Sequence, residues 1–348
     1  MIGGEVAGVF VTGAVSASLA GAGMAWRKRA GGSRAARAEA TVRPILYDGM
    51  ERGEFDPRVL AALTSAERHA LDSLARSLLP KVRGSDQEAL GRLLDRRGYV
   101  DDARRRSHSR RARVRARAGE FLGNSGSPAA VGDLVPLLRD PDPQVRWAAA
   151  RGLGRLGHAG ALSPLLSSLE GPRALPVDLV ADAIIQIRDC PMSVLRQGLQ
   201  SRSVPTRALT VELLGRFQAL AASDDIVGLL HRDPSVEVRA RAARALGRMG
   251  SPRSVDALLA SIDDGPLAMR VQAVWALGEI GDPRTAPVLA RLLVGPTRQL
   301  TDAAAVALAA MGAAGVDVLE HAAKGEGHAA AVSAQALTAR SELEPSHR

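Results

Sequence analysis

Cysteine, lysine and aromatic residues are scarce in this sequence of 348 residues. The single cysteine, Cys190, excludes an internal disulfide and is typical of a protein from a reducing compartment. Only three residues are lysine, although Lys and Arg together number 46, so nearly all of the positive charge is arginine. Because Phe, Trp and Tyr make up only 3% of the chain, a hydrophobic core must be built from Leu, Val, Ile and Ala.

Recognisable catalytic and metal-binding motifs are lacking as well. The sequence contains no H-E-x-x-H, C-x-x-C or G-x-x-x-x-G-K-[ST] pattern, and its seven histidines are scattered along the chain. We therefore expect no catalytic residue, no metal site and no cofactor.

What the sequence does contain is a repeat. The stretch "VRARAARALGRMG" runs from Val238 to Gly250 and returns as "MRVQAVWALGEIG" from Met269 to Gly281. We align the copies on the arginine that stands eight residues before the glycine of "LG". The equivalent positions are Arg115, Arg146, Asp178, Arg207, Arg239, Arg270 and Thr301. Their spacings are 31, 32, 29, 32, 31 and 31, which indicates a repeat architecture.

Each repeat is expected to form two antiparallel helices. In the copy that starts near Asp233, that side chain can cap a helix, and Pro234 suits a first helical position. Apolar residues then recur at helical spacing until Gly250, where a left-handed backbone costs glycine nothing. A second apolar stripe follows at Val255, Leu258, Leu259 and Ile262. Because one such pair cannot bury its apolar face alone, neighbouring pairs must stack.

This pattern resembles the short HEAT repeats of the phycobilisome-lyase-like class. The resemblance rests on D-P-x-x-x-V-R-x-x-A-A-x-A-L-G-x-x-G, followed by a proline and "AV..LL..L", and covers about residues 112–323. It implies an all-α fold, an armadillo-like α-solenoid of about seven HEAT-like helix pairs, used for binding. Deoxyhypusine hydroxylase has similar repeats and holds iron with His-Glu pairs, but no histidine of this chain precedes a glutamate. Residues 85–126 are weakly similar to membrane-anchored bacterial HEAT proteins.

The N-terminal segment is predicted to be a transmembrane anchor. From Val6 to Trp26 no residue is charged, and about 31 Å of helix would span a hydrocarbon core of ~30 Å. Glu5 precedes the segment and "RKR" follows it, which favours an outside N-terminus and a cytoplasmic repeat domain. The residues assigned to the anchor are Val6, Phe10, Val11, Leu19, Trp26, Arg27, Lys28 and Arg29. A cleaved signal peptide and a soluble segment are the alternatives.

The sequence predicts five regions: an anchor at residues 1–29, a linker at 30–55, an N-terminal helical cap at 56–110, a solenoid at 111–340 and a disordered tail at 341–348. Two capping-box spacings, Thr64 with Glu67 and Ser85 with Glu88, mark helix starts in the cap.

Arginines cluster where the cap meets the solenoid. Residues 26–120 carry 23 Lys plus Arg against 13 Asp plus Glu, whereas residues 121–348 carry 23 of each. The basic patch consists of Arg104, Arg105, Arg106, Arg110, Arg111, Arg113, Arg115 and Arg117. It can contact anionic lipid or an acidic protein, bind nucleic acid, or form a solvated helix face. Nucleic acid is the less favoured partner because no aromatic residues interleave with the arginines.

Two further features of the repeats bear on function. The repeated arginines, Arg115, Arg146, Arg207, Arg239 and Arg270, are expected to form a structural ladder that bonds nearby carboxylates or carbonyls. Five residues after the aligned arginine, four copies have a charged residue, and one has Trp275. That tryptophan either packs beneath a neighbour or is a hot spot for a partner.

Together these features predict a membrane-anchored scaffold that binds a protein, such as a membrane-associated enzyme, at the cytoplasmic membrane face. A HEAT-fold enzyme of bilin-lyase or hydroxylase type and a nucleic-acid binder are the alternatives.

Overall fold

The structure is a computed structural model that describes residues 34–263 and 265–343. Every regular element in these residues is a helix, which confirms the predicted all-α fold. The chain divides into two compact units. Unit 1 extends to His108 and includes Asn124–Ala130, and unit 2 comprises Ser109–Gly123 and the chain from Val131 onward.

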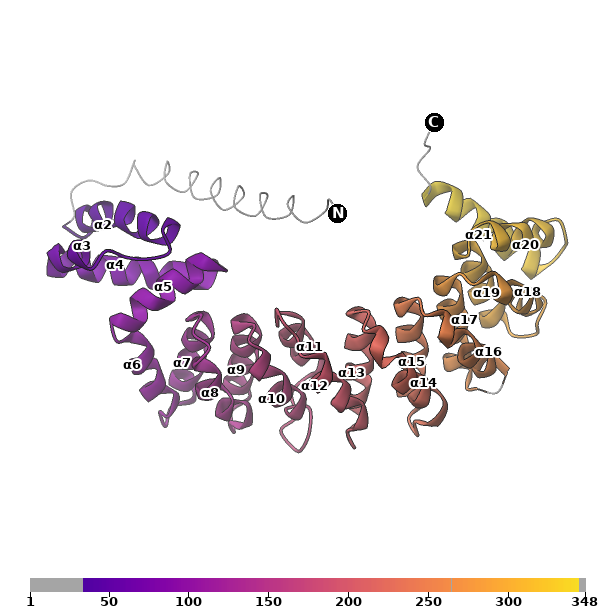
Figure 1. Cartoon of the computed structure of the whole chain (residues 1–348), viewed down its shortest axis with the longest axis horizontal. Coiled ribbons are helices and arrows are strands. Elements are labelled where there is room, and N and C mark those ends of the chain that lie inside the picture. The colour runs from indigo at the N-terminus through magenta and orange to yellow at the C-terminus, as the bar shows by residue number, and fades with distance from the viewer. Residues whose placement is uncertain (1–33, 264, 344–348) are drawn as a thin grey trace. The chain divides into compact units, whose positions relative to one another are not determined.

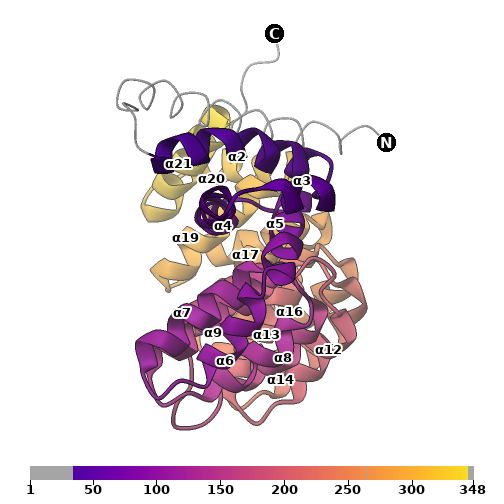
Figure 2. The same ribbon diagram turned by 90° about the vertical axis from the view of Figure 1, so that its left-hand side faces the viewer.

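The described part of unit 1 contains five α-helices. They are α2 (Arg34–Glu51), α3 (Pro57–Ala62), α4 (Ser65–Leu78), α5 (Ser85–Arg96) and α6 (Tyr99–Ser107). Helix α2 packs against α4 and α5, and Figure 2 shows α4 nearly end-on beneath α2. Leu46, Leu71 and Leu90 are at most 1% exposed and form the centre of this unit. The capping box of Thr64 and Glu67 is present at the start of α4, whereas Gly84 rather than Ser85 caps α5.

The linker predicted for residues 30–55 is wrong, because α2 occupies most of that range. Ala38, Val42 and Leu46 recur every four residues and are buried, so they give α2 an apolar stripe that packs on unit 1. The arginines and small residues around them had suggested a flexible segment. The placement of this unit as a cap over the solenoid stays a prediction.

Unit 2 consists of successive helix pairs, as Figure 1 shows. The first helices are α7 (Ala112–Asn124), α9 (Pro143–Leu156), α11 (Val177–Ile185), α13 (Val204–Arg216), α15 (Val236–Met249), α17 (Leu267–Ile280) and α19 (Arg298–Ala310). The second helices are α8 (Ala130–Leu134), α10 (Leu162–Ser167), α12 (Met192–Gln197), α14 (Ser223–Arg232), α16 (Val255–Asp263), α18 (Ala286–Leu293) and α20 (Ala313–Ala323). A last helix, α21 (His328–Leu343), follows and packs on α19 and α20. The predicted tail therefore starts inside α21, and residues 344–348 lie outside the described residues.

The helices form two layers because each one packs against its counterpart in the next pair. In the first layer α13 contacts α15, α15 contacts α17, and α17 contacts α19. In the second layer α14 contacts α16, and α18 contacts α20. Leucine, valine, isoleucine and alanine fill the space between the layers, as the scarcity of aromatic residues requires. Within unit 2 this arrangement is the predicted α-solenoid.

The glycine of each "LG" lies where two first-layer helices touch. A Cβ atom on Gly247 would lie 2.6 Å from Cα of Ala276, and one on Gly278 would lie 2.5 Å from Cα of Ala307. Real Cβ atoms do not approach other atoms so closely, so only glycine allows this backbone separation. The glycine therefore sets the distance between consecutive repeats.

The same contact corrects the alignment of the third copy. In the other copies, the "LG" glycine faces a residue of the next copy that stands six positions after the aligned residue of that copy. Gly215, for example, faces Ala245. Gly154 instead faces Ala183, which is only five residues after Asp178. Val177 is therefore the structural equivalent of the repeated arginine, and Asp178 lies one position beyond it. The spacings on either side of this copy become 31 and 30, which are closer to the period of the other copies.

The predicted start of α15 is also shifted. The Asp233 carboxylate accepts a hydrogen bond from the Ser235 N–H at 2.8 Å, but Ser235 caps the helix, so Pro234 precedes it. At the other end, Gly250 adopts the left-handed conformation as predicted, with φ of 62°. Helix α9 is shifted in the same way: Asp140 and Pro141, the equivalents of Asp233 and Pro234, precede the helix, and Asp142 caps it with Pro143 as its first residue.

No helix in the described part of the chain has both the length and the apolar character that a membrane crossing requires. The anchor predicted for residues 1–29 lies outside the described residues.

We expect the substitution Gly247→Ala to destabilise unit 2 by about 1–3 kcal/mol, because its methyl group must push α15 away from α17. The shift can be measured as the midpoint of urea unfolding followed by circular dichroism.

The matched control is Gly228→Ala in α14, where an added Cβ has no neighbour within 4 Å. This control should leave the midpoint unchanged or raise it, since alanine is the better helix former by roughly 1 kcal/mol. Equal effects of the two substitutions would contradict the role of Gly247.

Candidate functional site

Two exposed apolar side chains line a groove of the first layer between α17 and α19. The groove has a volume of about 430 Å³. Its lining residues are Ala268, Val271, Gln272 and Trp275 from α17, and Gln299, Asp302, Ala303 and Val306 from α19. We call this surface the apolar groove.

Trp275 and Val306 are the large apolar residues of the groove that face solvent. Trp275 is 41% exposed and Val306 is 60% exposed. Both stand five residues after the aligned position of their copy, Arg270 and Thr301. The corresponding residues in the other five copies are charged, namely Glu120, Arg151, Asp182, Glu212 and Arg244. The apolar character of this position is therefore confined to the last two copies.

Polar contacts hold the rim of the apolar groove. Arg244 Nε of α15 donates a hydrogen bond of 2.9 Å to the Gln272 side-chain oxygen. On the other side, His328 Nε2 of α21 lies 2.7 Å from the Asp302 carboxylate. The groove thus combines apolar side chains with polar residues on α17 and α19 that are held by hydrogen bonds. Protein-binding surfaces commonly have an apolar centre and a polar rim.

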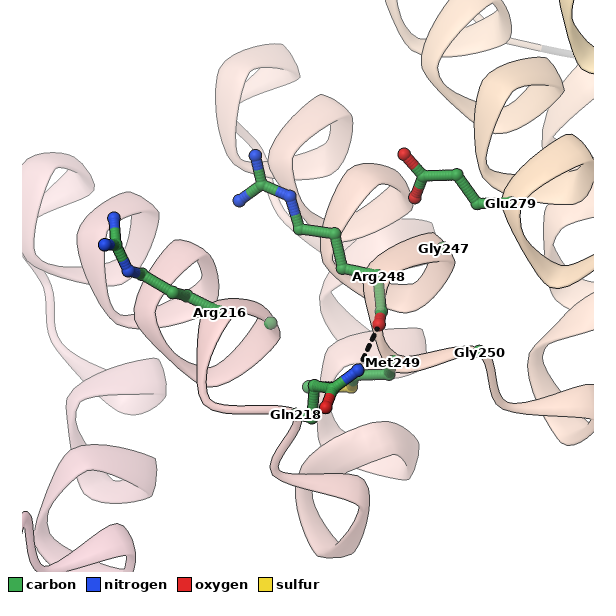
Figure 3. Close-up of a pocket in the computed structure, with 8 residues that line it drawn as sticks. Arg216, Gln218, Gly247, Arg248, Met249, Gly250 and Glu279 are labelled. Carbon is green, nitrogen blue, oxygen red and sulfur yellow. Dashed lines mark hydrogen bonds between the residues drawn. The ribbon is translucent and has the colours of Figure 1, made fainter. Parts of the chain in front are cut away.

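A second depression lies at the carboxyl ends of α13 and α15 and has a volume of about 620 Å³. It is lined by Gly215, Arg216, Gln218, Gly247, Arg248, Met249, Gly250 and Glu279. Figure 3 shows the Arg216 and Arg248 side chains extending in the same direction from neighbouring helices, with Glu279 beyond Arg248. The Gln218 amide donates to the Arg248 carbonyl at 3.3 Å. We call this depression the basic pocket.

The arginines of the predicted basic patch are divided between the two units. In α6, Arg104 pairs with Asp101 at 3.0 Å, and Arg105 and Arg106 both pair with Asp102. These three arginines belong to unit 1, whereas the patch from Arg110 onward belongs to unit 2. Four patch residues are exposed and form no ion pair within the described residues: Arg110, Arg111, Arg113 and Arg117.

Two of the repeated arginines form bidentate ion pairs. Arg115 donates from Nε and Nη2 to the Asp140 carboxylate at 2.7 and 2.8 Å. Arg207 pairs in the same way with Asp233, at 2.7 and 2.9 Å. In both cases Nη1 donates to a carbonyl of the loop before the arginine's own helix, from Ser109 or Ser201. Each arginine therefore ties its first helix to the loop at the end of the second helix.

The remaining repeated arginines bond to carbonyl groups. Arg146 donates to the Asp140 carbonyl at 2.9 Å, and Arg239 donates to the Asp233 carbonyl at 2.6 Å. Arg270 donates to the Ile262 carbonyl at 2.6 Å. Asp140 and Asp233 are thus each held by the arginines of two consecutive repeats.

These contacts keep the Asp233 carboxylate charged. Burial alone would raise the pKa of Asp233, but hydrogen bonds from Arg207 and Ser235, with the charges of Arg207 and Arg239, outweigh it and lower the pKa. The pKa of Arg207 is raised, chiefly by its hydrogen bonds to Asp233. The guanidinium of Arg207 is therefore neutralised inside the fold rather than offered to a ligand.

Nothing in the described residues assembles a metal site, since no group of three or more His, Cys, Asp or Glu side chains is placed to hold an ion. Burial raises the pKa of the Cys190 thiol, which lowers its reactivity as a nucleophile. The residues assigned to the anchor, Val6 to Arg29, lie outside the described residues.

Sequence reasoning singled out Trp275 but missed Val306 and the basic pocket. The signal for Val306 was present, because it stands at the same position of its repeat as Trp275. The basic pocket could not be found in this way, because Arg216 and Arg248 come from different repeats and look like ordinary exposed arginines.

Comparison with known proteins places the repeats in a family. The family model for HEAT repeats matches residues 103–184, 192–269 and 225–309, which together cover more than half of the chain. A HEAT repeat-containing taxis protein of Halobacterium salinarum is 30% identical over 161 residues. The matched part is 46% of this chain and 37% of that protein, so the chain spans little more than a third of the relative's length.

Solved structures of low sequence identity align with the helical stack. Kap121p bound to Nup53p shares the fold, with a TM-score of 0.52 and 13% identity over 84% of this chain and 37% of Kap121p. The complex of CpcE and CpcF of phycocyanin lyase from Nostoc sp. aligns with a TM-score of 0.32 and 22% identity, over 70% of this chain and 94% of that chain.

We expect Arg207→Met to lower the free energy of unfolding by about 3–5 kcal/mol, because it leaves the buried Asp233 carboxylate without its partner. Arg146→Met should cost only about 1 kcal/mol, since Arg146 donates to carbonyls alone. Urea unfolding of the two variants beside the parent protein gives both values. Equal losses of unfolding free energy in the two variants would show that the ion pair of Arg207 with Asp233 contributes no more than the hydrogen bonds of Arg146 to carbonyl groups.

Proposed function

The chain belongs to the HEAT-repeat family, and on that basis we propose that it is a scaffold that binds a protein partner through the apolar groove. The proposal is one of binding and not of catalysis. The whole first layer offers surface for such binding, but the groove between α17 and α19 differs from the rest in character.

The observation that carries this proposal is the exposure of Trp275 beside Val306. Solvent-exposed tryptophan in a groove is the type of side chain that dominates the binding energy of protein interfaces. The equivalent residues Glu120, Arg151, Glu212 and Arg244 show that the repeat itself does not need an apolar side chain at this position. The close contact of α17 with α15 is made by Ala276 against Gly247, and Ala276 is buried whereas Trp275 is exposed.

Other features support a binding role over the alternatives. The three arginines Arg104, Arg105 and Arg106, which would lead a nucleic-acid site, are already paired with aspartates of their own helix. A HEAT-fold enzyme of lyase or hydroxylase type would need a catalytic or metal-binding set, and the histidines of this sequence have no adjacent glutamate after them.

We further propose that the scaffold is attached to the cytoplasmic membrane by residues 1–29, with its repeats on the cytoplasmic side. The support is the uncharged run from Val6 to Trp26 and the "RKR" after it. A membrane-associated enzyme is the class of partner that this location would favour.

The substitution Trp275→Ala is expected to weaken partner capture by at least about 30-fold, the equivalent of ~2 kcal/mol for a hot spot. Detergent-solubilised membranes from the source cells, passed over the immobilised full chain, supply the partner. Quantitative mass spectrometry then compares what the parent and the variant retain.

Arg151→Ala is the matched control, because Arg151 occupies the same position as Trp275 in another repeat and is also exposed. Retained proteins should disappear with Trp275→Ala and persist with Arg151→Ala. Retention that is indifferent to both changes contradicts the proposal, and iron bound stoichiometrically to the purified chain would favour the enzyme alternative.

Removal of residues 1–29 should move the protein from the membrane to the soluble fraction of lysed cells. A second variant, with Arg27, Lys28 and Arg29 replaced by serine, keeps the apolar run and should weaken only the orientation of the anchor. Carbonate-washed membranes and protease protection of the repeat domain are the measurements. A truncated protein that still sediments with membranes would contradict attachment through this segment.

A further inference from the structure

Two rows of side chains run across the first layer near its C-terminal end. One row contains Glu212 of α13, Arg244 of α15, Trp275 of α17 and Val306 of α19, each five residues after the aligned position. The other row, four residues further along each helix, contains Arg216 of α13, Arg248 of α15 and Glu279 of α17. Residues four apart lie on the same helix face, so the two rows are adjacent.

Three arginines in these rows have no acidic partner. Arg216, Arg244 and Arg248 are exposed, and none forms an ion pair with a carboxylate in the described part of the chain. Figure 3 shows Arg216 and Arg248 projecting from the basic pocket side by side. Glu279 is the one acidic residue that lines this pocket, so the lining carries a positive excess.

Two other arginines of unit 2 differ from these three because carboxylates neutralise them. Arg241, on the same helix as Arg244, pairs with both Glu212 and Glu237. Arg196 in the second layer pairs with Asp225. Among the exposed arginines of the unit without an ion pair, Arg244 and Arg248 are distinguished by their place beside the apolar groove.

The basic pocket and the apolar groove are neighbouring depressions of the first layer. Arg244 Nε donates to the side-chain oxygen of Gln272, and Gln272 lines the apolar groove. Arg248 lies one helical turn beyond Arg244 and lines the basic pocket. A ligand that lies across α15 and α17 would therefore contact the guanidinium groups of Arg244 and Arg248 on α15 and the indole of Trp275 on α17.

We propose that these two neighbouring depressions together bind a linear segment of a partner protein in which acidic residues stand next to one or two bulky apolar residues. The inference rests on the proposed function and adds the chemistry of the partner. The carboxylates of the segment pair with Arg244 and Arg248, and its apolar side chains fill the apolar groove between Trp275 and Val306. Charge complementarity fixes the direction in which the segment lies.

A peptide library displayed on phage tests this without knowledge of the partner. The random peptides are selected on the immobilised full chain and counter-selected on the Trp275→Ala variant. Enriched peptides are then synthesised with a fluorescent label, and their affinity is measured by anisotropy at several salt concentrations. The variants are Trp275→Ala, the double variant Arg244→Ser with Arg248→Ser, and the control Arg151→Ser.

We expect the enriched peptides to be rich in Asp and Glu beside Leu, Phe or Trp. The double arginine variant should bind these peptides with an affinity lower by about tenfold or more. Its affinity should also depend less on the salt concentration, because charge pairs at a surface are screened by salt. Arg151→Ser should change neither. Circular dichroism of each variant shows that the helices are intact.

Two results would overturn the proposal in different ways. The first is that the enriched peptides depend on Trp275 but are neutral or basic, or bind equally well to the double arginine variant. This result refutes an acidic segment as the ligand and leaves the proposed function standing. Failure to enrich any peptide over the Trp275→Ala variant refutes the apolar groove itself. Displacement of the enriched peptides by anionic phosphatidylserine vesicles, with the same dependence on Arg244 and Arg248, would assign the surface to lipid and also refute it.

Discussion

The close approach of first-layer helices at the "LG" glycine is the constraint on which unit 2 depends. At Gly247 and Gly278 the next helix passes so near that no side chain fits, and an alanine of that helix fills the contact. Small residues at this point bring the larger leucines and valines on either side into register. In the third copy Ile185 stands in place of this glycine and Val177 in place of the aligned arginine.

The repeated arginines stabilise the stack of helices whose close approach the glycines allow. Asp140 and Asp233 each accept hydrogen bonds at the carboxylate from one repeat and at the carbonyl from the next. These charges are satisfied within the fold. Arg244 and Arg248, by contrast, are exposed and have no carboxylate partner in the described residues, and they lie beside the groove that contains Trp275.

The period of the sequence was sufficient to predict helix pairs, their order and the glycine that ends α15. It was not sufficient for α2, whose stripe of Ala38, Val42 and Leu46 is short and set among arginines. The tryptophan of the candidate site was found because it breaks a pattern at one position of the repeat. The arginines of the basic pocket could not be identified from the sequence, because only the three-dimensional structure shows which arginines lie near a carboxylate.

If unit 2 is a linear stack in which each repeat packs only on its neighbours, one complete period can be removed without loss of the fold. Deletion of residues 236–266 joins Ser235 to Leu267 and sets Gly215 against Ala276. The stack predicts a shorter protein with the same helicity per residue and a single cooperative unfolding transition, measured by circular dichroism. A shortened protein that has lost its helices, or that unfolds without a transition, would contradict a linear stack.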